Sequence, residues 1–130
     1  MQINESIENY LERILILQRE KGCARSIDIA SALGVTKPSV SHATKLLREN
    51  GYITMDSDNA ISLTQAGREI AERMFERHET LARFLMRIGV PEAIAIADAC
   101  KMEHDISAET FAAICAHAGK GETGHDIQKL

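Results

Sequence analysis

The feature that most constrains the fold is a pair of short amphipathic segments joined by a tight turn at Gly34. In residues 26–33 and 37–49 the apolar side chains recur at helical spacing. Ser26 is expected to cap the first helix and Thr36 the second, where Pro38 lies in the first turn and costs no hydrogen bond. Two short helices joined by a glycine-containing turn are typical of a helix-turn-helix.

The sequence period changes after this pair of helices. Tyr52 to Met55 and Ile61 to Leu63 are short β-like stretches separated by a polar turn, which predicts a β-hairpin. A helix-turn-helix followed by a hairpin predicts a winged helix-turn-helix. In that fold the second helix enters the DNA major groove and the hairpin touches the flanking backbone.

The remainder of the chain predicts helices, so the expected fold class is mainly α. Helical patterns cover residues 5–20, 64–89, 91–104 and 107–115, the last capped by Ser107. We expect an N-terminal winged helix-turn-helix domain over residues 1–70 and an all-helical domain over residues 71–130. The glycine-rich end from Gly119 onward is expected to be a mobile tail.

Charge is distributed unevenly along the 130 residues. The formal charge of −4 argues against a uniformly basic coat for nucleic acid, but residues 21–55 alone carry +3 and residues 91–130 carry −4. A modestly basic segment is often only a solvated face, so charge alone decides nothing.

The exposed start of the second short helix has the features of a DNA-reading surface. Short polar side chains such as Ser39 and Ser41 let a helix sit deep in the groove, where they and the helix N-terminus can donate to phosphates. His42 is expected to reach a base edge and Lys45 a phosphate; the alternative is that both only face solvent. The predicted DNA-binding residues are Thr36, Lys37, Pro38, Ser39, Ser41, His42 and Lys45.

A second group of residues offers donor atoms for a metal ion. Cys100, Glu103 and His104 stand at i, i+3 and i+4, which is one face of a helix. Thiolate, carboxylate and imidazole suit a divalent transition metal, although a buried cysteine beside a solvated Glu-His pair explains the spacing as well. His78 lies on the apolar stripe of the long helix, where a core histidine satisfied by a buried partner is the simplest explanation.

The first helix adds another polar pair beside its apolar stripe. Asn9 and Glu12 are also separated by three residues. We call Cys100, Glu103 and His104 the Cys100 group. If the three helices pack together, the Asn9–Glu12 pair, His78 and the Cys100 group form a cage of nitrogen, oxygen and sulfur donors. The acidic side chains of the C-terminal third would then serve in part to attract a metal cation.

Six motifs in order extend this pattern over residues 5–115: Ser6-Ile-Glu-Asn-Tyr-Leu-Glu12, Asp28-Ile-Ala, Val35-Thr-Lys-Pro-Ser-Val40, Leu63-Thr-Gln-Ala-Gly67, Arg77-His78 and Ala99-Cys-Lys-Met-Glu-His104. Together they resemble the metal-dependent regulators of the diphtheria toxin repressor and manganese transport regulator family. The resemblance implies a winged helix, a helical dimerisation domain with metal sites at the domain junction, and metal-activated repression of metal-uptake genes.

Carried over residue by residue, the resemblance implies two groups of metal ligands. The Cys100 group matches primary ligands of the iron-responsive branch, whereas Glu12 and His78 match second-site ligands of the manganese branch. Asn9 stands where the iron branch has methionine and the manganese branch aspartate. The expected metal ligands are Asn9, Glu12, His78, Cys100, Glu103 and His104.

The chain departs from the iron branch at its ancillary site. Ala82 stands where the family usually has glutamate, and Ile96 where the iron branch has histidine, so this site is expected to be incomplete. The chain also ends without the SH3-like third domain of many iron-responsive members, as in the shorter manganese type.

The donor set bears on the choice of metal. Carboxylate and amide oxygens suit Mn²⁺ or Fe²⁺, whereas a thiolate favours Fe²⁺ and tolerates Co²⁺, Ni²⁺ or Zn²⁺. We expect Fe²⁺, with Mn²⁺ a close second.

The expected protein is a homodimer that binds a double-stranded DNA operator once metal bridges its first helix, long helix and Cys100 group. The bridge would set the two reading heads about 34 Å apart, the spacing of successive major grooves. One alternative is a metal-independent winged-helix regulator with Cys100 as a redox sensor; another is a purely structural dimer module.

Neither enzymatic activity nor a small-molecule substrate is expected. A metalloenzyme is disfavoured because His78-Glu79 is not followed by the second histidine of an H-E-x-x-H helix, since residue 82 is alanine.

The sequence also favours a cytoplasmic protein that does not enter a membrane. No apolar run approaches the roughly 18 residues of a membrane span, and the N-terminus lacks the order of a signal peptide. Three cysteines at unrelated spacings suit a reducing compartment. Of these, Cys23 and Cys115 match no ligand position.

Overall fold

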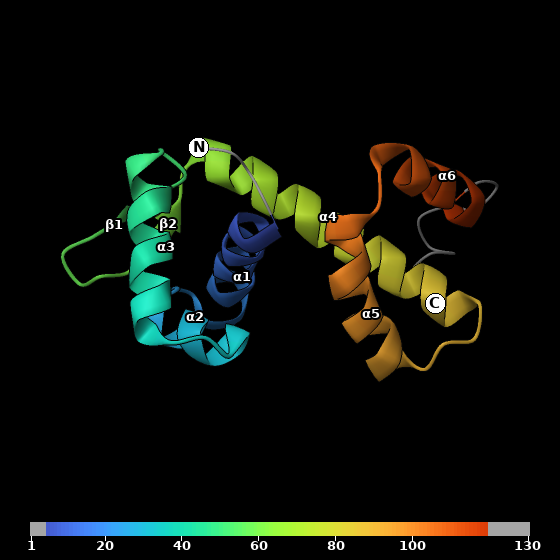
Figure 1. Ribbon diagram of the computed structural model, residues 1–130, viewed down its shortest axis with the longest axis horizontal. Coiled ribbons are helices and arrows are strands. Elements are labelled where there is room, and N and C mark those ends of the chain that lie inside the picture. Colours follow the sequence, from blue (N-terminus) through green and yellow to red (C-terminus); the bar gives the residue numbers. More distant parts are fainter. Residues whose placement is uncertain (1–4, 120–130) are drawn as a thin grey trace. The chain divides into compact units, whose positions relative to one another are not determined.

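The computed structural model describes residues 5–119, which form helices and one small sheet in the order expected (Figure 1). The predicted mobile tail begins at Gly119, which is the last residue of a helix in the structure; the rest of the predicted tail, residues 120–130, lies outside the described residues. The chain divides into two compact units, Met1–Arg73 and Met74–Leu130. The elements are α1 (Glu5–Lys21), α2 (Ser26–Leu33), α3 (Lys37–Glu49), β1 (Ile53–Met55), β2 (Ile61–Leu63), α4 (Gln65–Arg87), α5 (Glu92–Asp105) and α6 (Ala108–Gly119).

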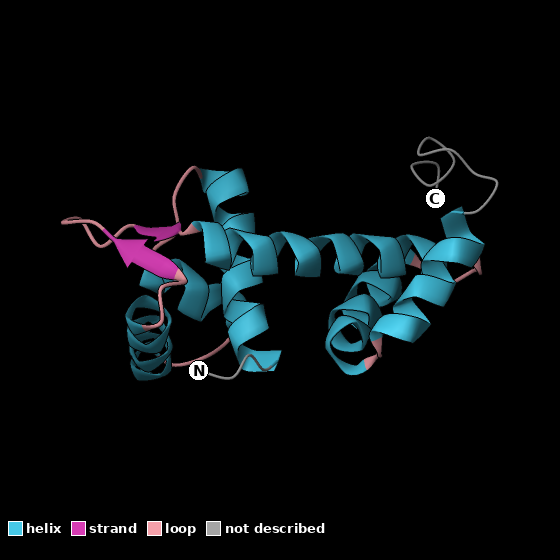
Figure 2. Ribbon diagram, turned by 90° about the horizontal axis from the view of Figure 1, so that it is seen from above, coloured by secondary structure: helices cyan, strands magenta, loops and turns pink. Residues whose placement is uncertain are grey.

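The first unit is a winged helix-turn-helix, as the sequence predicts. The apolar stripes of α1, α2 and α3 supply a core that includes Leu11, Ile14, Ile29 and Leu47, all with almost no exposed surface. Strands β1 and β2 pair antiparallel with Ile53 opposite Leu63, and Figure 2 shows them side by side with the loop between them extending outward. A β-bridge between Ala24 and Ile61 fixes the hairpin to the segment that joins α1 and α2.

The helix boundaries confirm most of the predicted signals. Thr36 caps α3 by accepting a hydrogen bond from the Ser39 N–H at 3.2 Å, and Gly34 has a positive φ of 67° in the turn before it. The prediction that Ser26 caps α2 is wrong. Arg25 is the N-cap residue, in extended conformation and without a side-chain capping bond, and Ser26 is the first helical residue. The bridge at Ala24 holds the chain extended up to this point.

The start of α4 packs closely against the segment that leads into β1. Thr64 donates its side-chain hydroxyl to the Gly51 carbonyl at 2.6 Å, and its main-chain N–H bonds to the Tyr52 carbonyl at 3.1 Å. Gly67 is buried at this approach, and a Cβ there would collide with the Tyr52 carbonyl. This close contact explains the glycine in the Leu63-to-Gly67 motif.

Substituting Gly67→Ala should therefore destabilise the first unit. The added methyl group must displace main-chain atoms, and overpacking of this kind costs about 1–3 kcal/mol. A urea unfolding curve should show a lower midpoint, whereas Gln65→Ala at an exposed position in the same turn should change stability by less than about 0.5 kcal/mol. Equal midpoints for the Gly67 variant and the unmodified protein would contradict this reading of the contact.

The second unit packs α5 and α6 against the part of α4 from Met74 onward. Its core contains Leu81, Ala82 and Ala99, with Met102, Ile106, Phe111 and Ile114 packed around them. The Arg77 guanidinium lies 4.7 Å from the centre of the Phe111 ring and donates to the Ile106 carbonyl at 3.3 Å. Ser107 caps α6, as predicted, by accepting from the Thr110 N–H at 3.0 Å.

Among the described residues, none of the helices combines the length and the apolar character that a membrane crossing requires.

Candidate metal centre and DNA-reading surface

Four of the predicted metal ligands lie together in the second unit. The His78 Nδ1 atom, on α4, is 3.4 Å from the Cys100 Sγ atom and 3.4 Å from a Glu103 carboxylate oxygen, both on α5. The second Glu103 oxygen is 3.2 Å from the His104 Nε2 atom. Helical spacing puts the three α5 residues on one face, and packing of α5 against α4 through Ala99 and Leu81 brings that face to His78.

This donor cluster, which consists of His78, Cys100, Glu103 and His104, is mostly buried. Glu103 and the His104 side chain are each only 1% exposed, and the His78 side chain is 16% exposed. Cys100 is exposed and so lies on the solvent side of the cluster. Burying a carboxylate is unfavourable unless charged partners compensate for it, so this arrangement points to a functional site.

The electrostatics of the cluster favour a bound positive charge. The Cys100 thiol and then the Glu103 carboxylate beside the ring raise the pKa of His78 to about 10, against the opposing effect of burial. Both neighbours therefore favour a positive charge at this position, which either a proton on His78 or a bound cation can supply.

The same donor atoms also fit a divalent metal ion. Bonds of about 2.1 Å to nitrogen or oxygen hold neighbouring ligand atoms about 3.0–3.5 Å apart. The donor atoms already lie 3.2–3.4 Å from one another at the three contacts. Two imidazoles, a carboxylate and a thiol also suit a first-row transition metal.

The other two predicted ligands lie on α1 in the first unit. Glu12 is buried, with 6% of its surface exposed, and Asn9 is half-buried. Glutamates are seldom this buried, so Glu12 shares the unusual burial of Glu103.

The two positions that depart from the iron branch carry no donor atoms. Ala82 is part of the core of the second unit, and Ile96 is exposed on α5. With Phe75, His78, Glu79, Arg83 and Met86 they line a cavity of about 250 Å³. Ala82 and Ile96 therefore add no ligand atom for a cation to this cavity.

The predicted DNA-reading surface lies at the start of α3. All seven predicted residues are exposed. The apolar residues Val40, Ala43 and Leu47 of the same helix are buried in the core. The exposed set comprises Thr36, Lys37, Pro38, Ser39, Ser41, His42 and Lys45.

A winged helix-turn-helix and a buried donor cluster define a metal-dependent DNA-binding regulator. Residues 2–61 match the family model for the N-terminal DNA-binding domain of iron-dependent repressors, and residues 64–128 match the model for their metal-binding and dimerisation domain. The chain belongs to the iron-dependent repressor family.

Curated relatives of similar sequence are transcriptional regulators. The transcriptional regulator MntR of Escherichia coli O157:H7 is 41% identical over 107 residues, which cover 82% of this chain and 69% of the relative. The HTH-type transcriptional regulator MntR of Lysinibacillus sphaericus is 35% identical over 124 residues, which cover 95% and 89% of the two chains.

Solved structures show the same fold. The crystal structure of T. acidophilum IdeR matches with a TM-score of 0.79 and 27% identity, over 96% of this chain and 58% of that one. A manganese-dependent transcriptional repressor in complex with manganese matches with a TM-score of 0.78 and 27% identity, over 85% and 51%. The chain thus spans between half and three fifths of the length of these two solved chains.

Proposed function

We propose that this protein is a homodimeric repressor of metal-homeostasis genes that binds a double-stranded DNA operator when a divalent metal occupies the donor cluster. The observation that carries the proposal is the buried cluster around Glu103 in a chain whose other unit exposes a DNA-reading helix. A protein that acts on operators works where the chromosome is, so we place it in the cytoplasm.

His78, Cys100, Glu103 and His104 are proposed as ligands, together with Glu12 and Asn9 of α1. Support for the first four comes from their mutual distances, and support for the α1 pair comes from its chemistry and the burial of Glu12. The bound ion would supply a fixed positive charge and directional bonds to these side chains.

Ligands drawn from both units give metal a way to control DNA binding. If side chains of α1 and α5 share one ion, fewer orientations of the reading helix relative to the dimer core remain available. An ion favours the DNA-binding state only by binding it more tightly, typically with a coupling of about 1–3 kcal/mol. In a homodimer, the favoured state presents two reading helices at successive major grooves, about 34 Å apart.

Fe²⁺ and Mn²⁺ are the proposed activating ions. The thiol of Cys100 favours Fe²⁺, since thiolates bind softer ions more strongly than carboxylates do. The similarity to a manganese-dependent repressor supports Mn²⁺. Because Cys100 is the softest donor of the cluster, it is the residue that should separate the two ions.

Substituting Cys100→Ser should raise the Fe²⁺ concentration needed for half-maximal DNA binding by about tenfold or more and change the Mn²⁺ concentration much less. The measurement is an anaerobic titration of each ion by fluorescence anisotropy, on a duplex that the protein selects from a randomised pool.

The control is Cys115→Ser, which changes a half-buried cysteine of the same unit and should leave both titrations unchanged. Equal shifts for the two ions would contradict the role of Cys100 in metal choice. DNA binding that ignores both ions but is lost on treatment with peroxide would instead favour a redox sensor.

A further inference from the structure

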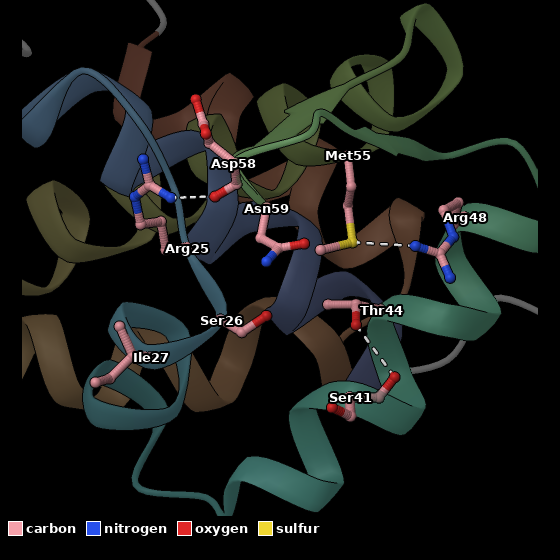
Figure 3. Close-up of a pocket in the computed structure, with 9 residues that line it drawn as sticks. All are labelled: Arg25, Ser26, Ile27, Ser41, Thr44, Arg48, Met55, Asp58 and Asn59. Atoms are coloured by element: carbon pink, nitrogen blue, oxygen red, sulfur yellow. Dashed lines mark hydrogen bonds between the residues drawn. The ribbon is translucent and has the colours of Figure 1, made fainter.

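The first unit contains an open cleft between α2, α3 and the hairpin, with a volume of about 480 Å³ (Figure 3). Its walls come from the residues before and at the start of α2, from one face of α3, and from the end of β1 and the hairpin loop that follows it. The lining residues are Arg25, Ser26, Ile27, Ser41, Thr44, Arg48, Met55, Asp58 and Asn59.

Two arginines give the cleft a positive character. In the view of Figure 3, Arg25 and Arg48 lie on opposite sides of the cleft, with Asn59 and Met55 between them. Arg25 donates to the main-chain carbonyl of Asp58, and Arg48 lies 3.3 Å from the Met55 sulfur. Among the described residues, these partners are neutral, so neither guanidinium charge is matched by a carboxylate.

The acidic groups near the cleft are mostly directed elsewhere. Asp58 turns its carbonyl to Arg25, while its carboxylate points away from Ser41 and Thr44 (Figure 3). Asp56 accepts the main-chain N–H groups of residues 58 and 60 through one carboxylate oxygen, at 2.8 and 3.0 Å. The Asp28 carboxylate lies 3.5 Å from the Lys21 ammonium group.

The walls of the cleft are held in place before any ligand binds. The Ile61 N–H donates to the Ala24 carbonyl at 2.8 Å, which ties the hairpin to the segment before α2. Thr44 is buried and donates its hydroxyl to the Ser41 carbonyl at 3.1 Å, which fixes its side chain against α3. Preformed walls lower the entropy that a ligand must lose on binding.

The cleft is continuous with the DNA-reading surface. Ser41 belongs to both, and Arg48 lies two helical turns farther along the same face of α3. When a helix lies in the major groove, the sugar–phosphate backbone runs beside it, between the helix and the flanking hairpin. The exposed Ile27, at 58% of its surface, offers an apolar contact to a sugar at the edge of the cleft.

We infer that this cleft receives a stretch of the sugar–phosphate backbone of one DNA strand, with Arg25 and Arg48 each contacting a phosphate. The inference rests on the proposed function and adds two residues and the hairpin wall to the predicted reading surface. Guanidinium groups bind phosphates through paired N–H donors, and each such contact releases a condensed counterion from DNA.

The test is the salt dependence of DNA binding by Arg48→Gln, Arg25→Gln and the double variant. The probe is a labelled duplex of about 30 base pairs that the protein selects from a randomised pool. It is long enough for two half-sites, and binding is measured with Mn²⁺ and with EDTA. Each substitution should lower the slope of log affinity against log salt by about 0.9 and reduce affinity about five- to tenfold near physiological salt. The Arg68→Gln control, on exposed α4 surface, should change neither.

Two readouts separate phosphate contact from a structural role. Ethylation interference should lose one sensitive phosphate per half-site in Arg48→Gln. The variant removes only a bond to sulfur, so its urea unfolding midpoint should stay unchanged.

Thermal shifts in inorganic phosphate, at matched ionic strength, test whether the cleft binds a free anion. Stabilisation by phosphate that is lost in the double variant, with an unchanged DNA salt slope, would overturn the assignment to the DNA backbone.

The outcomes also separate this inference from the proposed function. Unmodified protein that binds the duplex while both arginine variants keep its salt slope would overturn the inference alone. Unmodified protein that binds no duplex with either Mn²⁺ or EDTA would overturn both.

Discussion

Replacing Glu103 by glutamine should abolish the metal response of DNA binding. Glu103 contacts both histidines of the cluster, at 3.4 and 3.2 Å, and is the most buried carboxylate in the described part of the chain. Glutamine keeps the volume but loses the negative charge that a divalent ion requires. Loss of a primary ligand should weaken metal binding about a hundredfold or more, so Mn²⁺ and Fe²⁺ should no longer raise DNA affinity.

The measurement is isothermal titration calorimetry for the metal, together with anisotropy for DNA. Glu92→Gln is the matched control, because it makes the same charge change at an exposed position in the first turn of α5. A urea unfolding curve shows whether Glu103→Gln remains folded. A folded variant with an unaltered metal response would rule out Glu103 as a ligand.

Replacing Ser39 by glutamate should abolish DNA binding without weakening the fold. Ser39 lies in the first turn of α3, three residues after the capping Thr36. An acidic residue there completes a capping box and interacts favourably with the helix dipole. On the DNA side, its charge opposes a phosphate, and like charges brought together cost several kcal/mol. We expect affinity to fall about a hundredfold at unchanged or higher stability.

The control is Ser31→Glu, which adds the same charge at an exposed position on α2. Metal binding by Ser39→Glu should be normal in calorimetry, so the two variants, at Glu103 and Ser39, should separate metal binding from DNA binding. DNA affinity within about threefold of the unmodified protein would show that the start of α3 does not face DNA.

The local signals of the DNA-binding unit could be read from the sequence because each is complete within a few residues. Thr36, Pro38 and Gly34 specify a cap, a first turn and a left-handed turn without help from distant residues. Ser26 misled the prediction because the start of α2 depends on the bridge between Ala24 and Ile61, and their separation along the chain hides this contact.

The donor cluster could be predicted in part for the same reason. Helical spacing puts Cys100, Glu103 and His104 on one face, but their burial depends on how α5 packs. Helix α5 meets α4 through Ala99, and because its buried apolar residues Ala95 and Ala99 are small, the helix carries little apolar pattern. The deep burial of Glu103 and His104, with Cys100 at the surface, therefore emerges only from the tertiary structure.

The arginine cleft could not be predicted from the sequence pattern. Arg25 and Arg48 are far apart in the chain and looked like members of a modestly basic segment. Only folding of the hairpin against α2 and α3 brings them to one cleft with Asn59 and Met55. The spacing of Ser41 and Arg48, two helical turns apart on α3, does indicate that these two side chains share one face of the helix.

The most direct test of the central claim is the DNA affinity of the unmodified protein with and without metal. The same selected duplex is titrated anaerobically in EDTA, in Mn²⁺ and in Fe²⁺, with the ionic strength held constant. Metal control through the donor cluster predicts affinity about five- to 150-fold higher in Mn²⁺ or Fe²⁺ than in EDTA. Equal affinity under all three conditions would contradict it.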